Sequence, residues 1–311
     1  MYKEHCIAVT IPAYNEEPLI LSVIEAIPSY VDHIIVVDDC SSDNTYNTVA
    51  NSHLPKTILL STGRNQGVGG AMIAGYKKAL ELGSDIVVKM DGDGQMLPEY
   101  LASLLDAVID DGFAYAKGNR FLVPEFLSQM PRHRLIGNII LTFLTKLASG
   151  YWQIFDPQNG YTAIRAETLR SLNLSTIYKR FFFENDMLVK INIQNGRVKD
   201  VAISSKYGNE VSSLNVFQIV FTFPLLFLRR WTSRIYYKYV LRDFSPIALF
   251  LFLGLGLFFW GVAFGAYVWI HSISSGVASS TGTVMLSVLP LILGFQLLLQ
   301  AIVLDIQETP R

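Results

Sequence analysis

The chain has 311 residues, of which 51% are hydrophobic and 16% are charged, and its formal net charge is -1. This near-neutral balance argues against a basic nucleic-acid-binding protein, so no nucleic-acid partner is expected. Because the apolar excess is concentrated after about residue 215, the composition predicts a globular domain followed by a membrane segment. Cys6 and Cys40 are too few for a disulfide framework, and we expect both to be reduced core thiols.

Short apolar runs alternate with polar loops and helical patterns in the first part of the chain. Buried strands are predicted at Ile7–Ile11, Ile34–Val37, Thr57–Leu60 and Val87–Met90, with a later strand at Phe113–Lys117. Helices are predicted at Leu19–Ile27, Ala71–Leu82 and about 98–110, and Ser41 or Ser42 is expected to cap a further helix. This order indicates an α/β fold with a mostly parallel sheet and helices on both of its faces.

A polar loop follows each of the first four predicted strands. These loops contain Asn15-Glu16, Asp38-Asp39, Arg64-Asn65 and Asp91-Gly92-Asp93. Parallel strands end at one edge of a sheet, where ligands of such folds bind, so the loops together predict a nucleotide site. The chain lacks a Gly-x-Gly-x-x-Gly motif after its first strand and the Gly-Lys-Ser/Thr of a P-loop. These absences argue against a Rossmann oxidoreductase and a P-loop NTPase.

The fourth loop carries the residues of a candidate metal site. Alternation places Asp91 and Asp93 on the same side of an extended backbone, and Gln95 adds a carboxamide. Hard divalent ions, Mg²⁺ or Mn²⁺, prefer such oxygen ligands together with substrate phosphates. An isolated Asp-x-Asp is more often a solvated turn than a metal site. Its place at a strand end, before Pro98-Glu99 opens a helix, favours the metal site.

An apolar stretch from Leu135 to Leu147 follows a run of basic residues. Its helical stripe, which consists of Ile136, Ile139, Ile140, Phe143, Leu144 and Leu147, has two interpretations. The stretch is either a core helix or a helix that lies at a membrane surface beside a basic entrance. Another helix is predicted to open near Phe181–Met187, with its acidic residues at the positive N-terminal end.

The last hundred or so residues have the composition of a membrane anchor. Uncharged runs at about 247–270 and 284–304 predict two transmembrane helices. Five cationic residues precede them, Arg229, Arg230, Arg234, Lys238 and Arg242, mixed with Trp and Tyr as at a membrane interface. These cations predict a multi-pass protein of the inner membrane with both termini cytoplasmic, and the chain shows no signal peptide. The expected division is a cytoplasmic domain at 1–215, an amphipathic segment at 216–245 and a transmembrane hairpin at 246–311.

Residues 7–215, about two thirds of the chain, resemble a family 2 nucleotide-sugar glycosyltransferase with the GT-A fold. They are most similar to the branch of dolichol-phosphate mannose synthase and bacterial polyprenyl-phosphate glycosyltransferases. The motifs occur in matching order: Ile11-Pro12-Ala13-Tyr14-Asn15-Glu16, Val37-Asp38-Asp39, Asp91-Gly92-Asp93-Gly94-Gln95, Gly118-Asn119-Arg120-Phe121, Arg134 and Asp156-Pro157-Gln158-Asn159-Gly160-Tyr161. One departure is Ser213, where the family often has a basic residue. Another is Asp186, where hydroxyl-transferring relatives place a general base and lipid-phosphate enzymes often have Glu.

The resemblance implies transfer of a sugar from a UDP- or GDP-sugar to a polyprenyl phosphate, undecaprenyl or dolichyl, at the cytoplasmic membrane face. It implies nucleotide binding by Pro12, Tyr14, Glu16, Asp39, Arg64 and Asp91. It implies a Mg²⁺ or Mn²⁺ site at Asp91, Asp93 and Gln95, and acceptor binding by Arg120, Arg132 and Arg134. The catalytic residues that it implies are Asp93, Asp186 and Arg134.

Three hypotheses about the activity follow. A polyprenyl phosphate is already anionic, so its transfer needs cations rather than a base. The competing reaction is transfer to a hydroxyl of a glycan or lipid, with Asp186 as the general base. The third hypothesis is a catalytically inactive membrane scaffold, against which the complete metal motif argues. Membrane lipid is a further expected partner, and a homo-oligomer is compatible with the sequence.

Overall fold

The computed structural model describes residues 1–122, 132–204 and 216–310, and within these ranges the side chains of 132–134 and 216–220 are not described. The chain divides into two compact units. The first is Met1–Trp231 together with Pro310–Arg311, and the second is Thr232–Thr309.

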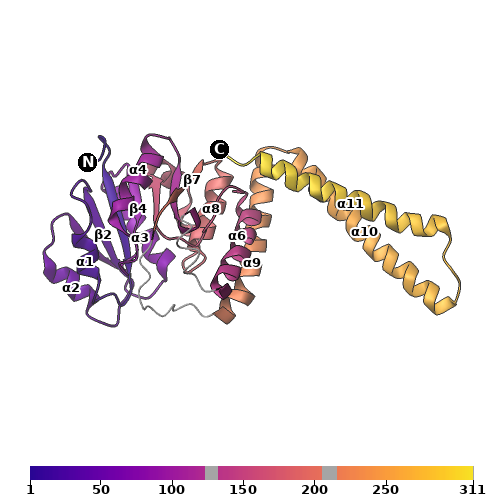
Figure 1. Ribbon diagram of the computed structural model, residues 1–311, viewed down its shortest axis with the longest axis horizontal. Coiled ribbons are helices and arrows are strands. Elements are labelled where there is room, and N and C mark those ends of the chain that lie inside the picture. The colour runs from indigo at the N-terminus through magenta and orange to yellow at the C-terminus, as the bar shows by residue number, and fades with distance from the viewer. Residues whose placement is uncertain (123–131, 205–215, 311) are drawn as a thin grey trace. The chain divides into compact units, whose positions relative to one another are not determined.

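The described residues of the first unit form a seven-stranded sheet with the order β3-β2-β1-β4-β6-β5-β7 (Figure 1). The strands are β1 Ile7–Ala13, β2 His33–Asp38, β3 Thr57–Ser61, β4 Ile86–Lys89, β5 Tyr115–Asn119, β6 Thr162–Arg165 and β7 Val198–Ala202. Neighbours among β1 to β4 pair in parallel, as do β5 and β7, whereas β6 runs antiparallel to both β4 and β5. The predicted, mostly parallel α/β sheet is therefore confirmed, and β6 and β7 are strands that the sequence pattern did not predict.

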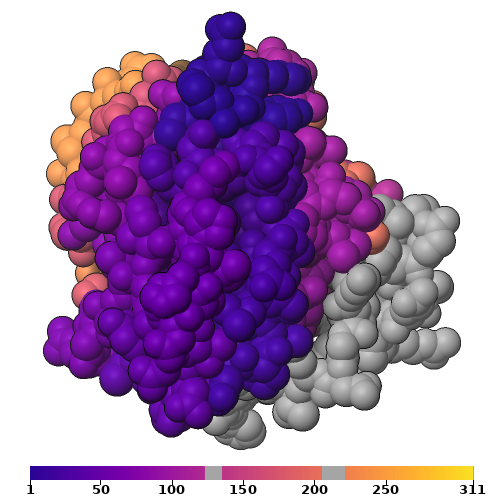
Figure 2. Space-filling model, turned by 90° about the vertical axis from the view of Figure 1, so that its left-hand side faces the viewer, coloured from indigo at the N-terminus to yellow at the C-terminus, as the bar shows by residue number. Residues whose placement is uncertain are grey.

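Helices cover both faces of this sheet. The helices in the described chain up to residue 234 are α1 Ile20–Glu25, α2 Thr45–Ser52, α3 Val68–Glu81, α4 Leu101–Ile109, α6 Arg132–Ser149, α7 Ala166–Ser171, α8 Phe183–Ile193 and α9 Val216–Arg234. In β1 the alternate residues Ile7, Val9 and Ile11 belong to one core with residues of α1 and α4. Ala8 points to the opposite core, which contains residues of α3 and α8. The N-terminal part of the chain, indigo to violet, forms most of the surface seen in Figure 2.

Two local predictions are wrong. The helix after β2 begins at Thr45, so neither Ser41 nor Ser42 caps it. Its first turn is held instead by Asp43, whose Oδ1 accepts a hydrogen bond from the backbone N–H of Thr45 at 3.0 Å. Cys40 is exposed in a left-handed turn and is not a core residue, because the chain leaves the sheet at the end of β2. Both Cys6 and Cys40 are free thiols, as predicted.

Most of the apolar stripe of α6 lies outside the core. Four of its six residues, Ile136, Ile139, Ile140 and Phe143, are exposed. The other two, Leu144 and Leu147, are half-buried, and Leu144 packs against a small buried cluster. The other side of α6 packs beside α9 (Figure 1), where Ala148 shares a small cluster with Phe182, Phe223 and Phe227. The core interpretation is therefore wrong for the four exposed residues of this stripe, whose apolar face fits the alternative of a membrane-surface helix.

The second unit contains a π-helical segment, Ile235–Arg242, and the helices α10 Pro246–Ser275 and α11 Thr281–Gln307. In the described part of the chain, these two helices are long and apolar enough to cross a membrane. They pack closely at small residues, since a β-carbon on Gly261 would lie 2.8 Å from Ser287 O and one on Gly294 2.4 Å from Phe258 N. At the other end of the hairpin, Arg234 Nη1 is 2.6 Å from Asp305 Oδ1, and both side chains are buried.

The contact between α3 and β1 gives a test of the packing. A β-carbon on Gly75 would lie 2.1 Å from Cγ2 of the buried Thr10, so the helix can approach the sheet only with glycine at this position. We expect Gly75→Ala to lower the free energy of unfolding by about 1–3 kcal/mol, because the extra methyl overpacks the core.

Gly137→Ala in α6 is the matched control, because no atom of the described residues lies within 4 Å of its β-carbon position. This change should be neutral or stabilising by up to about 1 kcal/mol, since alanine is the better helix former. Chemical unfolding of both full-length variants in detergent measures the difference. Equal stabilities would contradict the described helix-to-sheet contact.

Candidate functional site

The loops after β1 and β2 are joined by hydrogen bonds at the carboxyl edge of the sheet. Asn15 has a left-handed backbone, and its Oδ1 accepts from the backbone N–H of Ser42 at 2.8 Å. The backbone N–H of Glu16 donates to Thr45 Oγ1 at 2.9 Å. This bridging leaves Tyr14 exposed above the edge. Of the predicted nucleotide residues, Tyr14 and Glu16 therefore lie in one fixed turn, and Pro12 lies directly before it, near the end of β1.

Asp39 anchors the loop that follows β3. Its carboxylate is buried and accepts hydrogen bonds from Thr62 Oγ1 at 2.8 Å and from the backbone N–H groups of Gln66 and Gly67 at 2.9 and 2.6 Å. Asp39 thus holds the entrance to α3 in place. Arg64 lies in the same loop and is exposed. Asp39 and Arg64, both predicted nucleotide residues, therefore lie at the same edge of the sheet as Tyr14 and Glu16. The Asp39 carboxylate, however, already accepts hydrogen bonds from the loop after β3.

The Asp91–Asp93 motif follows β4 at this edge. Asp93 Oδ1 accepts from the backbone N–H of Gln95 at 3.0 Å, and Gly94 has a φ of +72°, which makes a tight turn. A β-carbon on Gly92 would lie 3.4 Å from Glu16 Cγ, so the motif adjoins the first nucleotide loop. Gly92 therefore allows the two loops to approach each other.

The donor set fits a hard divalent ion that shares its ligands with a substrate. Among the described residues, no three His, Cys, Asp or Glu side chains form a group that could hold a metal. A closed protein cage is therefore not found there. Asp91, Asp93 and Gln95 offer oxygen atoms, and Mg²⁺ or Mn²⁺ completes such a partial set with phosphate oxygens and water.

A buried lysine lies beside Asp91 and was not predicted from the sequence. Lys89 Nζ is 2.6 Å from Asp91 Oδ1 and 3.2 Å from Glu184 Oε1, and the lysine side chain is 2% exposed. Burial opposes the ammonium charge, but the two carboxylates outweigh it and raise the pKa of Lys89. Burial raises the pKa of Glu184, against the effect of Lys89. The signal in the sequence was a lysine within an apolar strand.

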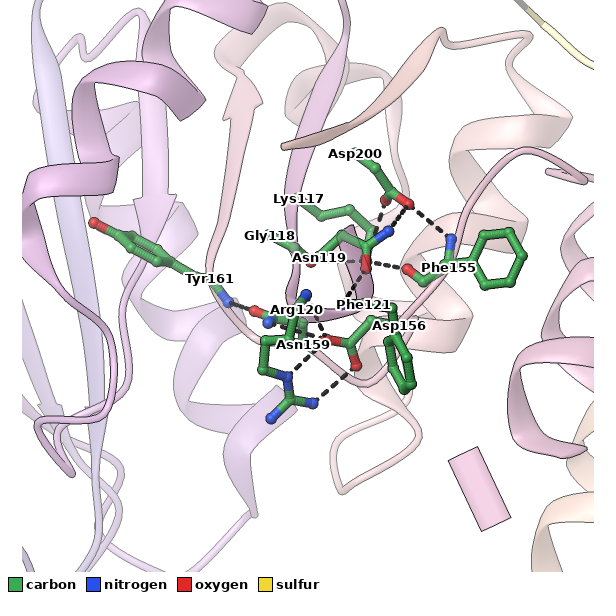
Figure 3. A network of polar contacts seen from close by, with 10 residues as sticks. All are labelled: Lys117, Gly118, Asn119, Arg120, Phe121, Phe155, Asp156, Asn159, Tyr161 and Asp200. Carbon is green, nitrogen blue, oxygen red and sulfur yellow. Dashed lines mark hydrogen bonds and ion pairs between the residues drawn. The ribbon is translucent and has the colours of Figure 1, made fainter. Parts of the chain in front are cut away.

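Arg120 belongs to a polar network at the end of β5 (Figure 3). Its Nε and Nη2 donate to the two oxygens of Asp156 at 2.7 and 2.8 Å, and its backbone N–H also donates to Asp156. Burial alone would raise the pKa of Asp156, but the bidentate contact with Arg120 lowers it. Arg120 was predicted to bind the acceptor substrate, but two of its N–H groups already donate hydrogen bonds to Asp156.

The same network joins β5, β7 and the turn between α6 and β6. Lys117 Nζ donates to the carbonyl of Phe155 at 2.7 Å and lies 3.4 Å from Asp200 Oδ1. Asn119 Nδ2 donates to Asp200 Oδ2 at 2.6 Å, and the backbone N–H of Tyr161 donates to Asn159 Oδ1 at 2.9 Å. The motif residues at 118–121 and 156–161 thus shape the edge of the site through their contacts with each other (Figure 3).

Asp186 is fully buried in the first turn of α8. Arg230 Nη2 donates to its Oδ2 at 2.9 Å, and the backbone N–H of Tyr178 donates to the same oxygen at 2.7 Å. Arg230 Nε is 2.7 Å from Oδ1, which is an ion-pair distance without hydrogen-bond geometry. Burial raises the pKa of Asp186, although Arg230 acts in the opposite direction. A general base must reach a substrate hydroxyl, and a buried carboxylate that is already in an ion pair is poorly placed to do so.

The remaining predicted acceptor residues are only partly described. Arg132 and Arg134 lie in the first turn of α6, and their side chains are outside the described part of the structure. The loop that contains Ser213 also lies outside the described residues.

Comparison with known proteins places this site in a family. Residues 8–172, more than half of the chain, match glycosyl transferase family 2. A UDP-N-acetylglucosamine–dolichyl-phosphate N-acetylglucosaminyltransferase of Methanococcus voltae is 35% identical in an alignment of 218 positions, which covers 64% of this chain and 86% of that protein. An undecaprenyl-phosphate mannosyltransferase of Micrococcus luteus is 32% identical over 62% of this chain and 81% of that protein.

The fold has solved relatives as well. The glucosyl-3-phosphoglycerate synthase of Mycobacterium tuberculosis, crystallised with Mn²⁺, UDP and glucosyl-3-phosphoglycerate, matches with a TM-score of 0.54 over 74% of this chain and 80% of that one. At 20% identity this likeness concerns the fold, which is the predicted GT-A fold. The family match and the motifs at the sheet edge lead to the same conclusion: the chain belongs to glycosyl transferase family 2.

Proposed function

We propose that this protein transfers a sugar from a nucleotide diphosphate sugar to a polyprenyl phosphate at the cytoplasmic face of a membrane. The observation that carries the proposal is the Asp91–Asp93 motif beside the Glu16 loop, on a chain that also contains the hairpin of α10 and α11. The names of the similar enzymes from Methanococcus voltae and Micrococcus luteus support a lipid-phosphate acceptor.

The donor would bind at the carboxyl edge of β1 to β4. Pro12, Tyr14 and Glu16 would frame the nucleoside, with Asp39 holding the neighbouring loop and Arg64 near the base or phosphates. Asp93 and Gln95, with Asp91 at their side, would hold Mg²⁺ or Mn²⁺. A bound ion of this kind supplies charge stabilisation to the departing diphosphate.

The acceptor is the point on which the two enzymatic hypotheses differ. A phosphate nucleophile needs no proton removed, whereas a hydroxyl needs a base within reach. The burial of Asp186 and its pairing with Arg230 argue against its service as that base. Because Arg120 is held by Asp156, Arg134 is our candidate for the main cation at the acceptor phosphate, and Arg132 is a second candidate.

We also propose the membrane arrangement. The catalytic domain at 1–215 would lie in the cytoplasm, residues 216–245 would lie at the membrane interface, and residues 246–311 would form a hairpin across the inner membrane. The cationic residues that precede α10 support this orientation.

The metal site is tested by Asp93→Asn. We expect transfer to fall by at least about 100-fold, because an amide cannot balance the charge of the ion that stabilises the leaving group. EDTA should abolish the activity of the wild type, and added Mg²⁺ or Mn²⁺ should restore it. The assay uses a panel of nucleotide sugars with undecaprenyl phosphate, and mass spectrometry detects the lipid product. Asp110→Asn, an exposed aspartate that pairs with Lys3, is the matched control. Full activity in EDTA would contradict the metal role.

The orientation is tested with reporter fusions. A reporter after Arg311 should be cytoplasmic, and one inserted in the link between α10 and α11, at 276–280, should be on the opposite side. Protease protection of sealed vesicles provides an independent measurement. The reversed pattern would remove the donor site from the compartment that contains nucleotide sugars.

The acceptor is tested by a pair of variants. Losing a bidentate phosphate contact in Arg134→Ala should cost about 2–3 kcal/mol, or about 30- to 150-fold in rate. Asp186→Asn/Arg230→Gln removes the candidate base together with its ion-pair partner, so neither charge of the pair is left without an opposite charge. If the acceptor is a phosphate, this double variant should keep most of its rate.

The initial rates of the variants are compared, and thermal melts check that each variant is folded. The control for Arg134→Ala is Arg170→Ala, because Arg170 is an exposed arginine at the opposite edge of the sheet. A normal rate for Arg134→Ala beside a folded but inactive double variant would favour the hydroxyl acceptor.

A further inference from the structure

Lys89 is a buried cation next to the candidate donor site, and nothing in the proposed chemistry requires it. It ends β4, whose four residues Ile86–Lys89 are all buried. A lysine in such a place is costly unless carboxylates meet its charge, and here two of them do. Asp91 Oδ1 is 2.6 Å from the ammonium and Glu184 Oε1 is 3.2 Å from it.

Glu184 links this cation to another part of the fold. It lies in the first turn of α8, where the positive end of the helix favours a carboxylate, and its side chain is 11% exposed. Asp91 is more accessible, with a side chain that is 30% exposed. The chain of contacts therefore runs from buried Glu184 through buried Lys89 to the Asp91 carboxylate at the surface of the site.

Gly160 closes this arrangement from a third side. A β-carbon there would lie 2.2 Å from Lys89 Nζ and 2.7 Å from Asp91 Oδ2. Any larger residue would displace the lysine or the aspartate. The turn that contains Gly160 is itself fixed by the Arg120–Asp156 network. Lys89 is thus confined by two carboxylates and by backbone.

We infer that Lys89, held by Glu184, is a positioning residue that fixes the Asp91 carboxylate for a hydroxyl group of the nucleotide-sugar donor. The inference rests on the proposed function. Lys89 occupies one oxygen of Asp91 and leaves Oδ2 to accept a hydrogen bond. A divalent ion on the same carboxylate would be repelled by the nearby ammonium, so the ion belongs with Asp93 and Gln95.

The experiment separates this role from a purely structural one. Lys89→Met alone leaves the buried charge of Glu184 without an opposite charge and is expected to destabilise the fold. Lys89→Met/Glu184→Gln removes both charges and should recover most of the lost stability. Lys78→Met is the matched control, because Lys78 pairs with Glu81 on an exposed helix face. All proteins are full length and purified in detergent.

Two measurements are made on the folded double variant. The first is the KM and kcat for UDP-N-acetylglucosamine or GDP-mannose, whichever the wild type uses, with undecaprenyl phosphate as acceptor. We expect the donor KM to rise by at least about tenfold, since an oriented hydrogen bond to a charged group is lost. The second is calorimetric titration with Mn²⁺ alone, where we expect a change of less than about threefold.

A donor KM equal to that of the wild type would overturn the inference, because Asp91 would then need no support from Lys89. A fall in Mn²⁺ affinity of about tenfold or more would also overturn it, since Asp91 would then act mainly on the metal. If the wild type transfers no sugar from any nucleotide sugar, the proposed function itself fails, and this result is distinct from either outcome.

Discussion

A charge removed from water must be met by an opposite charge, and this constraint organises the described interior of the protein. Lys89 forms ion pairs with Asp91 and Glu184, Lys117 pairs with Asp200, and Arg234 pairs with Asp305. Such a pair costs about 3–5 kcal/mol when one partner is removed. Each also joins distant parts of the chain, for example Lys117 and Asp200, which are 83 positions apart. The pairs therefore fix which strands and helices meet as well as neutralise charge.

The same constraint bears on two of the residues that the sequence predicts for the site. Arg120 and Asp186 carry the residue types of an acceptor clamp and a general base, yet each is already in an ion pair, Arg120 with the buried Asp156 and Asp186 with the partly exposed Arg230. Asp93 and Gln95 are joined to each other by a backbone hydrogen bond and lie in a turn beside Glu16 at the carboxyl edge of the sheet. A phosphate acceptor is consistent with this arrangement, because it requires cations at the site but no base.

The contact between the apolar helices α10 and α11 depends on a different feature, the packing of small residues. Contact between them depends on close backbone approach at Gly254, Gly261 and Gly294, while most large apolar side chains face outward. At its charged end, Arg234, Tyr239 and Asp305 satisfy one another, since the hydroxyl of Tyr239 donates to Asp305 Oδ1 at 2.6 Å. In the first unit, the exposed apolar face of α6 is a second surface suited to lipid.

The sequence alone determined the order of strands and helices in the first four repeats, the edge at which their loops gather, the family and the two apolar helices. These features follow from local periodicity, composition and short motifs, which act within a few residues. Tertiary structure alone decided that β6 runs antiparallel, that most of the stripe of α6 faces outward, and that Arg120 and Asp186 are paired. It also decided that Lys89 lies between Asp91 and Glu184. Glu184 is 95 positions away from Lys89, so no local pattern in the sequence indicates this pair, and the two buried charges meet only in the folded chain.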